Sequence, residues 1–171
     1  EVENLIQTKY SVNDICEIAN DNAEGQVIIS GSKESVDKFQ IILKEKKIKS
    51  IPLKVSAPFH CSLMKPAAEK MKEKINNVIF KNPTVDIINN VTAKPENNAE
   101  NIKRLLIEQI FSTVKWRESI INMSKANVIN YIEIGPGKVL TGMAKRTIKN
   151  LKCFSINTIA DIEKLNNEFK K

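Results

Sequence analysis

The chain has 171 residues, of which 42% are hydrophobic and 27% charged, a balance that suits one ordinary domain or a small domain with part of a larger one. Its formal net charge of +7 at pH 7 indicates an anionic partner, such as nucleic acid, an anionic membrane or an acidic protein. Three scattered cysteines and a single histidine argue against a disulfide scaffold and against the usual zinc sites.

The composition narrows the choice of partner further. Sequence-specific nucleic-acid readers use arginine forks and stacked aromatic rings, whereas aromatic residues are 5% of this chain and arginine occurs only at positions 104, 117 and 146. An acidic protein partner or a merely solvated lysine-rich surface fits better than nucleic acid. No apolar run approaches the ~18 residues of a membrane span. We therefore expect no nucleic acid, no membrane, no metal and no cofactor.

The first third of the chain predicts a small unit of helices and strands. Its predicted elements are a helix over 1–9, strands over 14–20 and 26–30, and a helix over 32–47 capped by Ser32. Residues 48–55, IKSIPLKV, alternate apolar and polar side chains and predict a third strand. This order is that of a ferredoxin-like unit without its first strand, so we expect residues 1–56 to form an incomplete small subdomain.

Beyond residue 57, helices and strands alternate, which is typical of an α/β sheet with helices on its faces. The predicted helices cover 63–78, 98–110, a stretch beginning near Trp116, 139–150 and a final stretch with a capping box at Thr158 and Asp161; the predicted strands cover 85–89, 128–134 and 153–157. The apolar strand VINYIEI (128–134) is expected to be buried on both faces of a parallel sheet. Residues 57–171 are therefore assigned to one larger domain. The polar first residues, without a methionine, are expected to lie inside a domain.

The only histidine, His60, lies in the loop VSAPFHCSLM, directly before a predicted helix. Pro58 and Phe59 make this loop stiff and apolar, so that the imidazole is held in a fixed direction, as a general base requires. A lone histidine is more often a packed or surface residue. The side chain of Cys61 is expected to diverge from its neighbour, and no serine lies in a G-x-S-x-G elbow. The residues alone thus offer a base without a nucleophile.

Two further motifs have ordinary explanations. IGPGKVLTG (134–142) differs from a phosphate-binding loop in glycine spacing and lacks a hydroxyl side chain after Lys138, so a tight turn between strand and helix is the better interpretation. INNVTAKP (88–95) places asparagines at the end of a strand, where α/β sheets border their ligands. Turn chemistry explains the same residues equally well.

Taken together, several segments resemble the motifs of the malonyl-CoA:acyl carrier protein transacylases of type II fatty acid synthesis, in order and spacing. These segments are SAPFHCSLMKPAAEKM, VDIINNVTAKP, VKWRESI and IEIGPGKVLTGMAKR, and GQVIISGSKESVDKF is similar to the small subdomain of that family. The resemblance covers essentially all of the chain. It implies the C-terminal part of an α/β-hydrolase-like acyltransferase domain, with an inserted ferredoxin-like subdomain whose first strand lies upstream.

The resemblance also implies roles for individual residues. His60 matches the catalytic histidine, and the main-chain carbonyl of Gln109 is expected to accept its other N–H in place of a carboxylate. Phe59 would border the malonyl pocket, and Asn20 and Asn22 would line the cleft near the pantetheine arm. The serine nucleophile, the malonyl-binding arginine and the oxyanion loop of the family are expected upstream. The chain alone is therefore expected to be inactive.

The implied activity is a ping-pong transfer of a malonyl group from malonyl-CoA to the phosphopantetheine thiol of acyl carrier protein. Acyl carrier proteins are acidic, so a lysine-rich face would steer docking, and Lys65, Lys94 and Lys138 lie near the motif loops. The expected partners are malonyl-CoA, the carrier protein and the N-terminal half of the enzyme. The alternatives are an acyltransferase domain of a polyketide synthase and a non-catalytic basic binding module. The expected location is the bacterial cytoplasm, with a plastid as the alternative.

Overall fold

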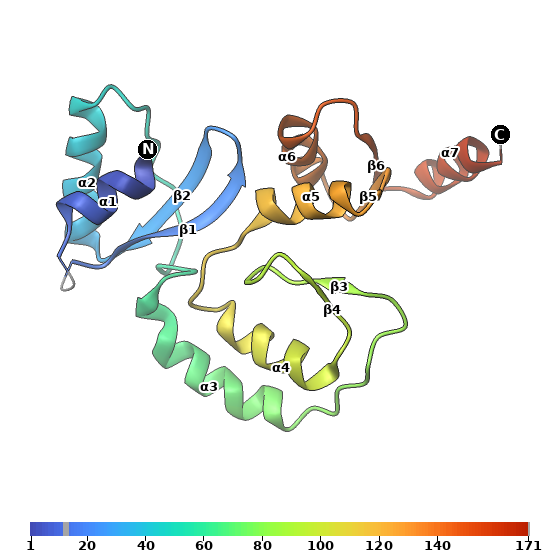
Figure 1. Cartoon of the computed structure of the whole chain (residues 1–171), viewed down its shortest axis with the longest axis horizontal. Coiled ribbons are helices and arrows are strands. Elements are labelled where there is room, and N and C mark those ends of the chain that lie inside the picture. Colours follow the sequence, from blue (N-terminus) through green and yellow to red (C-terminus); the bar gives the residue numbers. More distant parts are fainter. Residues whose placement is uncertain (12–13, 171) are drawn as a thin grey trace.

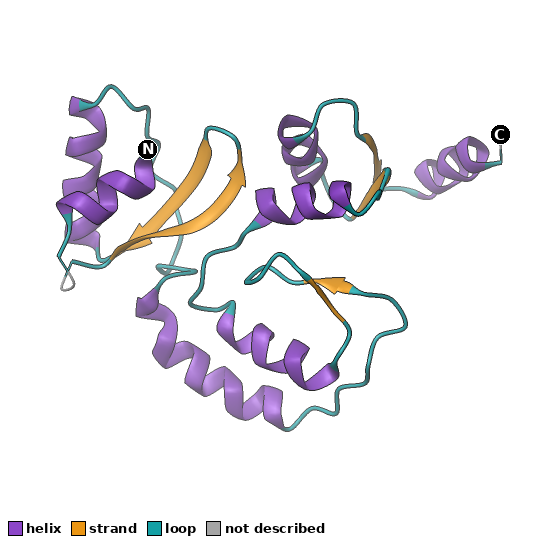
Figure 2. Ribbon diagram, in the orientation of Figure 1, coloured by secondary structure: helices purple, strands orange, loops and turns teal. Residues whose placement is uncertain are grey.

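The computed structural model describes residues 1–11 and 14–170. Its helices are α1 (Val2–Lys9), α2 (Lys33–Glu45), the short 3-10 helix η1 (Ser62–Met64), α3 (Lys65–Asn76), α4 (Ala99–Glu108), α5 (Trp116–Lys125), α6 (Val139–Thr147) and α7 (Ile159–Phe169). Its strands are β1 (Cys16–Ala23), β2 (Gln26–Gly31), β3 (Ile87–Ile88), β4 (Pro95–Glu96), β5 (Asn130–Ile134) and β6 (Lys152–Ile156). Within the described residues these strands form three separate two-stranded sheets (Figure 2).

Strand β1 contacts elements from both halves of the chain. It pairs with β2, and it packs against α1 and α2 as well as against α5 and α6. In Figure 1 the hairpin of β1 and β2 lies between the α1–α2 pair and the α5–α6 pair, and α3 and α4 lie side by side below it. Helix α7 extends beyond β6 at the C-terminal end of the molecule (Figure 1).

The N-terminal unit has its own small core. Cys16, Phe39 and Leu43 are buried together between β1 and α2. The Tyr10 hydroxyl donates to the Ser35 carbonyl oxygen at 2.7 Å, and its ring meets Phe39 edge-on at a centroid distance of 5.7 Å. The two predicted helices and two predicted strands of this unit are confirmed, because local apolar spacing and the Ser32 cap determine them.

The third strand predicted over residues 48–55 is wrong, because this segment is neither helix nor strand. Ile51, Leu53 and Val55 do alternate, but their side chains are 68%, 56% and 63% exposed. An alternating pattern gives a strand only where a neighbouring strand supplies hydrogen-bond partners. No strand of the described residues pairs with residues 48–55, so this segment does not form a strand.

The strand predicted over residues 85–89 is much shorter than expected. Only Ile87 and Ile88 form β3, and they pair antiparallel with β4 rather than joining a parallel sheet. The Asn89 side chain ends the strand, because its Oδ1 accepts the N–H groups of Val91 at 3.1 Å and Thr92 at 2.9 Å. Side-chain hydrogen bonding of this kind folds the backbone into a turn.

Strands β5 and β6 are parallel, as predicted, but β5 is not buried on both faces. Ile132 is 43% exposed and Ile134 is 82% exposed. Parallel sheets normally have both faces covered, so β5 presents an apolar surface that nothing in the described chain covers. The turn after β5 is tight, as predicted, with positive φ at Gly135 and Gly137, and the predicted capping box at Thr158 begins α7.

The close approach of Gly31 to the backbone of Ile15 leaves no room for a side chain at position 31. A Cβ on residue 31 would clash with the carbonyl oxygen of Ile15, which also accepts the Ser32 N–H. We expect Gly31→Ala to lower the free energy of unfolding of this chain by about 1–3 kcal/mol, measured by urea denaturation with circular dichroism. Gly142→Ala is the matched control, because a Cβ there meets nothing within 4 Å and alanine favours a helix by about 0.5–1 kcal/mol. Equal stability of the two variants would contradict the prediction.

The N-terminal core also predicts a loss of stability at alkaline pH. Burial raises the pKa of Cys16 from 9.0 to about 11 and the pKa of Tyr10 from 10.0 to about 12. The folded state holds the protons of Cys16 and Tyr10 more tightly than the unfolded state does. The contribution of these two groups to the free energy of unfolding is therefore fully present below pH 9 and is lost as the pH rises from 9 to 12. We expect a lower urea midpoint at pH 11 than at pH 8, with a smaller difference in Cys16→Ala. The same pH dependence in that variant would contradict the role of the thiol.

Candidate active site

His60 occupies a strained backbone position in the loop before η1. Its φ of 59° lies in the left-handed region, which costs a side-chain-bearing residue about 1–3 kcal/mol. Such residues persist where the surrounding contacts hold them, and they cluster at functional sites. Phe59, the preceding residue, is 46% exposed. The loop therefore presents an aromatic ring and a strained histidine next to each other.

The imidazole of His60 contacts the end of a helix that lies far away in the sequence. Its Nδ1 is 2.8 Å from the main-chain carbonyl oxygen of Gln109, 49 positions later. A carbonyl oxygen can only accept, so Nδ1 carries the proton and donates it. The neutral ring then keeps its lone pair on Nε2, and no group of the described residues pairs with Nε2. A ring in this tautomer can take up a proton at Nε2.

Gln109 offers its carbonyl oxygen because α4 ends there. The last carbonyl groups of a helix have no partner within the helix, and the C-terminal end of a helix carries a partial negative charge. The Gln109 side chain is held as well, because Asn90 Nδ2 donates to its Oε1 at 3.2 Å. Helices α3 and α4 lie side by side, so that the end of α4 and the start of α3 come together near the hairpin (Figure 1).

Asn20 and Asn22 lie on β1, in a part of the strand that bulges twice. The register with β2 shifts between Ile18 and Asn20 and again between Asp21 and Ala23. Bulges re-aim side chains and are frequent beside functional sites. Asn22 is only 8% exposed, whereas Asn20 is half-buried. The structure therefore gives these two asparagines different surroundings, although both belong to the same strand.

Strand β1 is joined to the segment that follows Gln109. The Val114 N–H donates to the Ala19 carbonyl oxygen at 2.8 Å, and the Asp21 N–H donates to the Val114 carbonyl oxygen at 2.9 Å. The Thr113 hydroxyl adds a third contact, to the Ile18 carbonyl oxygen at 2.6 Å. His60 and Gln109 are thus in direct contact, and Phe59 adjoins His60 in the chain. The strand of the two asparagines is connected to them through residues 113 and 114.

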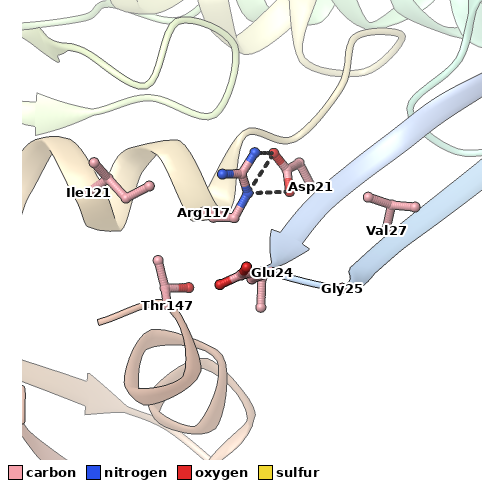
Figure 3. A pocket seen from close by; sticks show the side chains of 8 residues that line it. Asp21, Glu24, Gly25, Val27, Arg117, Ile121 and Thr147 are labelled. Carbon is pink, nitrogen blue, oxygen red and sulfur yellow. Dashed lines mark hydrogen bonds and ion pairs between the residues drawn. The ribbon is translucent and has the colours of Figure 1, made fainter. Parts of the chain in front are cut away.

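A pocket of about 450 Å³ lies beside this junction, at the tip of the hairpin (Figure 3). Arg117 donates from Nε and Nη2 to the carboxylate of Asp21, with a shortest distance of 2.7 Å. Hydrogen bonding to Asp21 raises the pKa of Arg117. None of the residues predicted for the active site lines this pocket, so it is distinct from the His60 loop. The ion pair fastens α5 to β1.

Cys61 is the cysteine next to His60, and it is engaged with the backbone of its own loop. Cys61 is fully buried, and its Sγ donates to the Pro58 carbonyl oxygen at 3.1 Å. Its thiol therefore binds the backbone of the loop and not the imidazole of His60. Within residues 1–11 and 14–170, no three His, Cys, Asp or Glu side chains gather as metal ligands would. Over the same residues, no helix has the length and apolar character needed to cross a membrane.

Several contacts of this region were not predicted. Asn90 holds Gln109, Arg117 holds Asp21, and Glu17 accepts both donors of Ser62, two residues after His60. Of these residues, only Asn90 was indicated by the sequence as a possible site residue, because it is one of the two asparagines at the end of a predicted strand. The other pairs join residues too distant in the sequence for any local pattern to indicate them.

Comparison with known proteins places these features in a family. The acyl transferase domain family matches residues 2–168. Malonyl CoA-acyl carrier protein transacylase of Haemophilus influenzae is 38% identical over 148 residues, which are 86% of this chain and 47% of that protein. The chain spans about half the length of the curated relatives it matches.

Solved structures agree with this similarity. The crystal structure of acyl-carrier-protein-S-malonyltransferase from Bartonella henselae has a TM-score of 0.92 and 38% identity, covering 99% of this chain and 54% of that one. A malonyl-transacylase in complex with its type II polyketide synthase acyl carrier protein has a TM-score of 0.85 and 36% identity, covering 97% of this chain and 53% of that one. These matches confirm the mixed α/β fold class. The chain belongs to the acyl transferase domain family.

Proposed function

We propose that this chain is part of an enzyme that transfers a malonyl group from malonyl-CoA to the phosphopantetheine thiol of acyl carrier protein. The observation that carries the proposal is the contact between His60 Nδ1 and the Gln109 carbonyl oxygen, at 2.8 Å. It leaves Nε2 as a base in a chain whose similar proteins are named malonyl-CoA transacylases. His60 and Gln109 are the catalytic pair of the proposal.

The contact explains how His60 would act in both halves of a ping-pong reaction. Nε2 takes the proton of a serine hydroxyl while the serine oxygen attacks the malonyl thioester carbonyl. The C–S bond breaks, and the proton passes from Nε2 to the departing thiolate of CoA. In the second half, Nε2 takes the proton of the phosphopantetheine thiol, which attacks the malonyl-serine ester, and returns it to the serine.

The proposal places the serine on a further part of the domain, outside the 171 residues. The coverage of about half of each relative supports this. The exposed side chains of Ile132 and Ile134 on β5 also support it, because a parallel sheet needs further strands or helices on its faces. The same part would supply the missing first strand of a ferredoxin-like subdomain over 1–56. Residues 57–171 would form the C-terminal part of the α/β-hydrolase-like domain.

Three residues are proposed as substrate contacts. Phe59 adjoins His60 and is 46% exposed, so its ring is available to border a malonyl group. Asn20 and Asn22 lie on the bulged part of β1, where amide groups could bind the polar pantetheine arm.

An acidic carrier protein is proposed as the macromolecular partner. Lys65, Lys94 and Lys138 are exposed, in agreement with a basic docking face. Complementary charge speeds association and makes it sensitive to salt. One similar protein is described in complex with its own carrier protein, which supports the same kind of partner here.

The alternatives are less well supported. An acyltransferase domain of a polyketide synthase would use the same residues, but the curated relatives are named as malonyl CoA-acyl carrier protein transacylases. A non-catalytic basic binding module would not need an imidazole fixed in one tautomer. The bacterial cytoplasm is the proposed location, because the relatives come from bacteria, and a plastid stays the alternative.

Acylation in a mixture with the complementary half tests the function directly. We expect malonyl-CoA to leave a malonyl adduct, seen by intact-protein mass spectrometry, only when the 171-residue chain is mixed with the complementary half of the domain, and on a serine of that half. His60→Ala should slow its formation by about 10²–10⁴-fold, because a general base is lost. An adduct on this chain alone would reveal a missed nucleophile. An unchanged rate in the variant would contradict the role of His60.

The tautomer of His60 is a second expected outcome. Because the chain has one histidine, its imidazole nitrogens give unambiguous signals in long-range ¹H–¹⁵N NMR spectra. We expect a protonated Nδ1 and an unprotonated Nε2 in the neutral ring, since the Gln109 carbonyl only accepts. The opposite assignment, with the proton on Nε2, would refute the proposed base.

A further inference from the structure

A carboxylate from β1 holds the residue two positions after the only histidine. The Ser62 N–H donates to Glu17 Oε2 at 3.0 Å, and the Ser62 hydroxyl donates to Oε1 of the same carboxylate. Both partners are partly buried, and 45 positions separate them in the sequence. Two donors of one residue therefore depend on a single carboxylate that belongs to another element.

The loop needs support at this point. His60 is held in the left-handed region, and the backbone then becomes extended at Cys61, with φ −137° and ψ 171°, before it enters η1 at Ser62. On one side of the turn, Cys61 Sγ donates to the Pro58 carbonyl oxygen. On the other side, the Glu17 carboxylate meets the first N–H of η1, where helical partners are missing and negative charge is favourable.

We propose that Glu17 is a positioning residue for His60. By holding Ser62, it fixes the strained turn in the one arrangement that keeps Nδ1 within 2.8 Å of the Gln109 carbonyl oxygen. That carbonyl belongs to the C-terminal end of α4, a different element from the loop. A small displacement of the loop would therefore lengthen the Nδ1 contact and release the ring to its other tautomer.

This inference rests on the proposed function only where it calls His60 the base. The geometry that it explains is the protonation of Nδ1, which can be measured without acyl transfer. A purely structural role for Glu17 makes a different prediction. If the role is purely structural, replacing Glu17 lowers the free energy of unfolding and leaves the tautomer of His60 in the folded protein unchanged.

Glu17→Gln tests the proposal in the 171-residue chain. Glutamine has nearly the same size but only one acceptor oxygen, so one of the two Ser62 donors loses its partner. We expect the ¹⁵N shifts of the two imidazole nitrogens to converge in the folded variant, because both tautomers become populated. In the mixture that forms the malonyl adduct, the rate should fall about 10-fold to 100-fold with an unchanged KM for malonyl-CoA.

Two further variants complete the experiment. Ser62→Ala removes the hydroxyl donor and keeps the N–H, so it should converge the shifts in the same direction but less. Glu34→Gln is the matched control, because it makes the same chemical change in an exposed pair with Lys38 on α2 and should leave the shifts unchanged. If Glu17→Gln does not fold, Ser62→Ala decides.

Unchanged ¹⁵N shifts in both Glu17→Gln and Ser62→Ala would overturn the proposal, and so would a loss of stability with an unchanged tautomer. Convergent shifts would support it. Convergent shifts together with no malonyl adduct in any mixture would support the positioning role while refuting malonyl transfer, so the two failures are distinguishable.

Discussion

Two backbone hydrogen bonds between β1 and Val114 connect the parts of the chain that the site requires. They extend the β1–β2 hairpin by one bridge, and they place the segment that follows α4 beside the strand that carries Asn20 and Asn22. The ion pair of Asp21 with Arg117 and the bond from Thr113 to Ile18 strengthen the same junction. Together with the contacts of Glu17 with Ser62 and of His60 with Gln109, this junction fixes the end of α4 relative to the hairpin.

The site makes use of the polar groups that helices leave unsatisfied at their ends. The Gln109 carbonyl at the end of α4 accepts the imidazole proton, and the first N–H of η1 meets the Glu17 carboxylate. His60 lies between these two helix ends. Each end supplies charge of the sign that suits its partner, since the C-terminal end is partly negative and the N-terminal end partly positive. One strained residue is thus held from both sides by ordinary features of helices.

Much of the secondary structure could be predicted from the sequence, because local signals determine it. The Ser32 cap, the capping box of Thr158 and the glycine turn after β5 are each complete within a few residues. The strand predicted over 48–55 does not form and the one predicted over 85–89 is shorter than expected, because a strand depends on a partner elsewhere. The His60 loop was indicated by its own residues, and the part played by Gln109 came from family resemblance. The contacts of Glu17 with Ser62 and of Asp21 with Arg117 join distant positions, so only the folded structure reveals them.

The acceptor for His60 is a main-chain atom, and this has a consequence for mutational tolerance. Any residue at position 109 brings a carbonyl oxygen, so a change of side chain there leaves the acceptor itself in place, whereas a catalytic aspartate would be lost by a single substitution. What an alteration of Gln109 removes is the bond from Asn90. The contact between His60 and the Gln109 carbonyl oxygen is therefore most sensitive to the position at which α4 ends. Substitutions that lengthen or shorten this helix are the ones that would displace the oxygen.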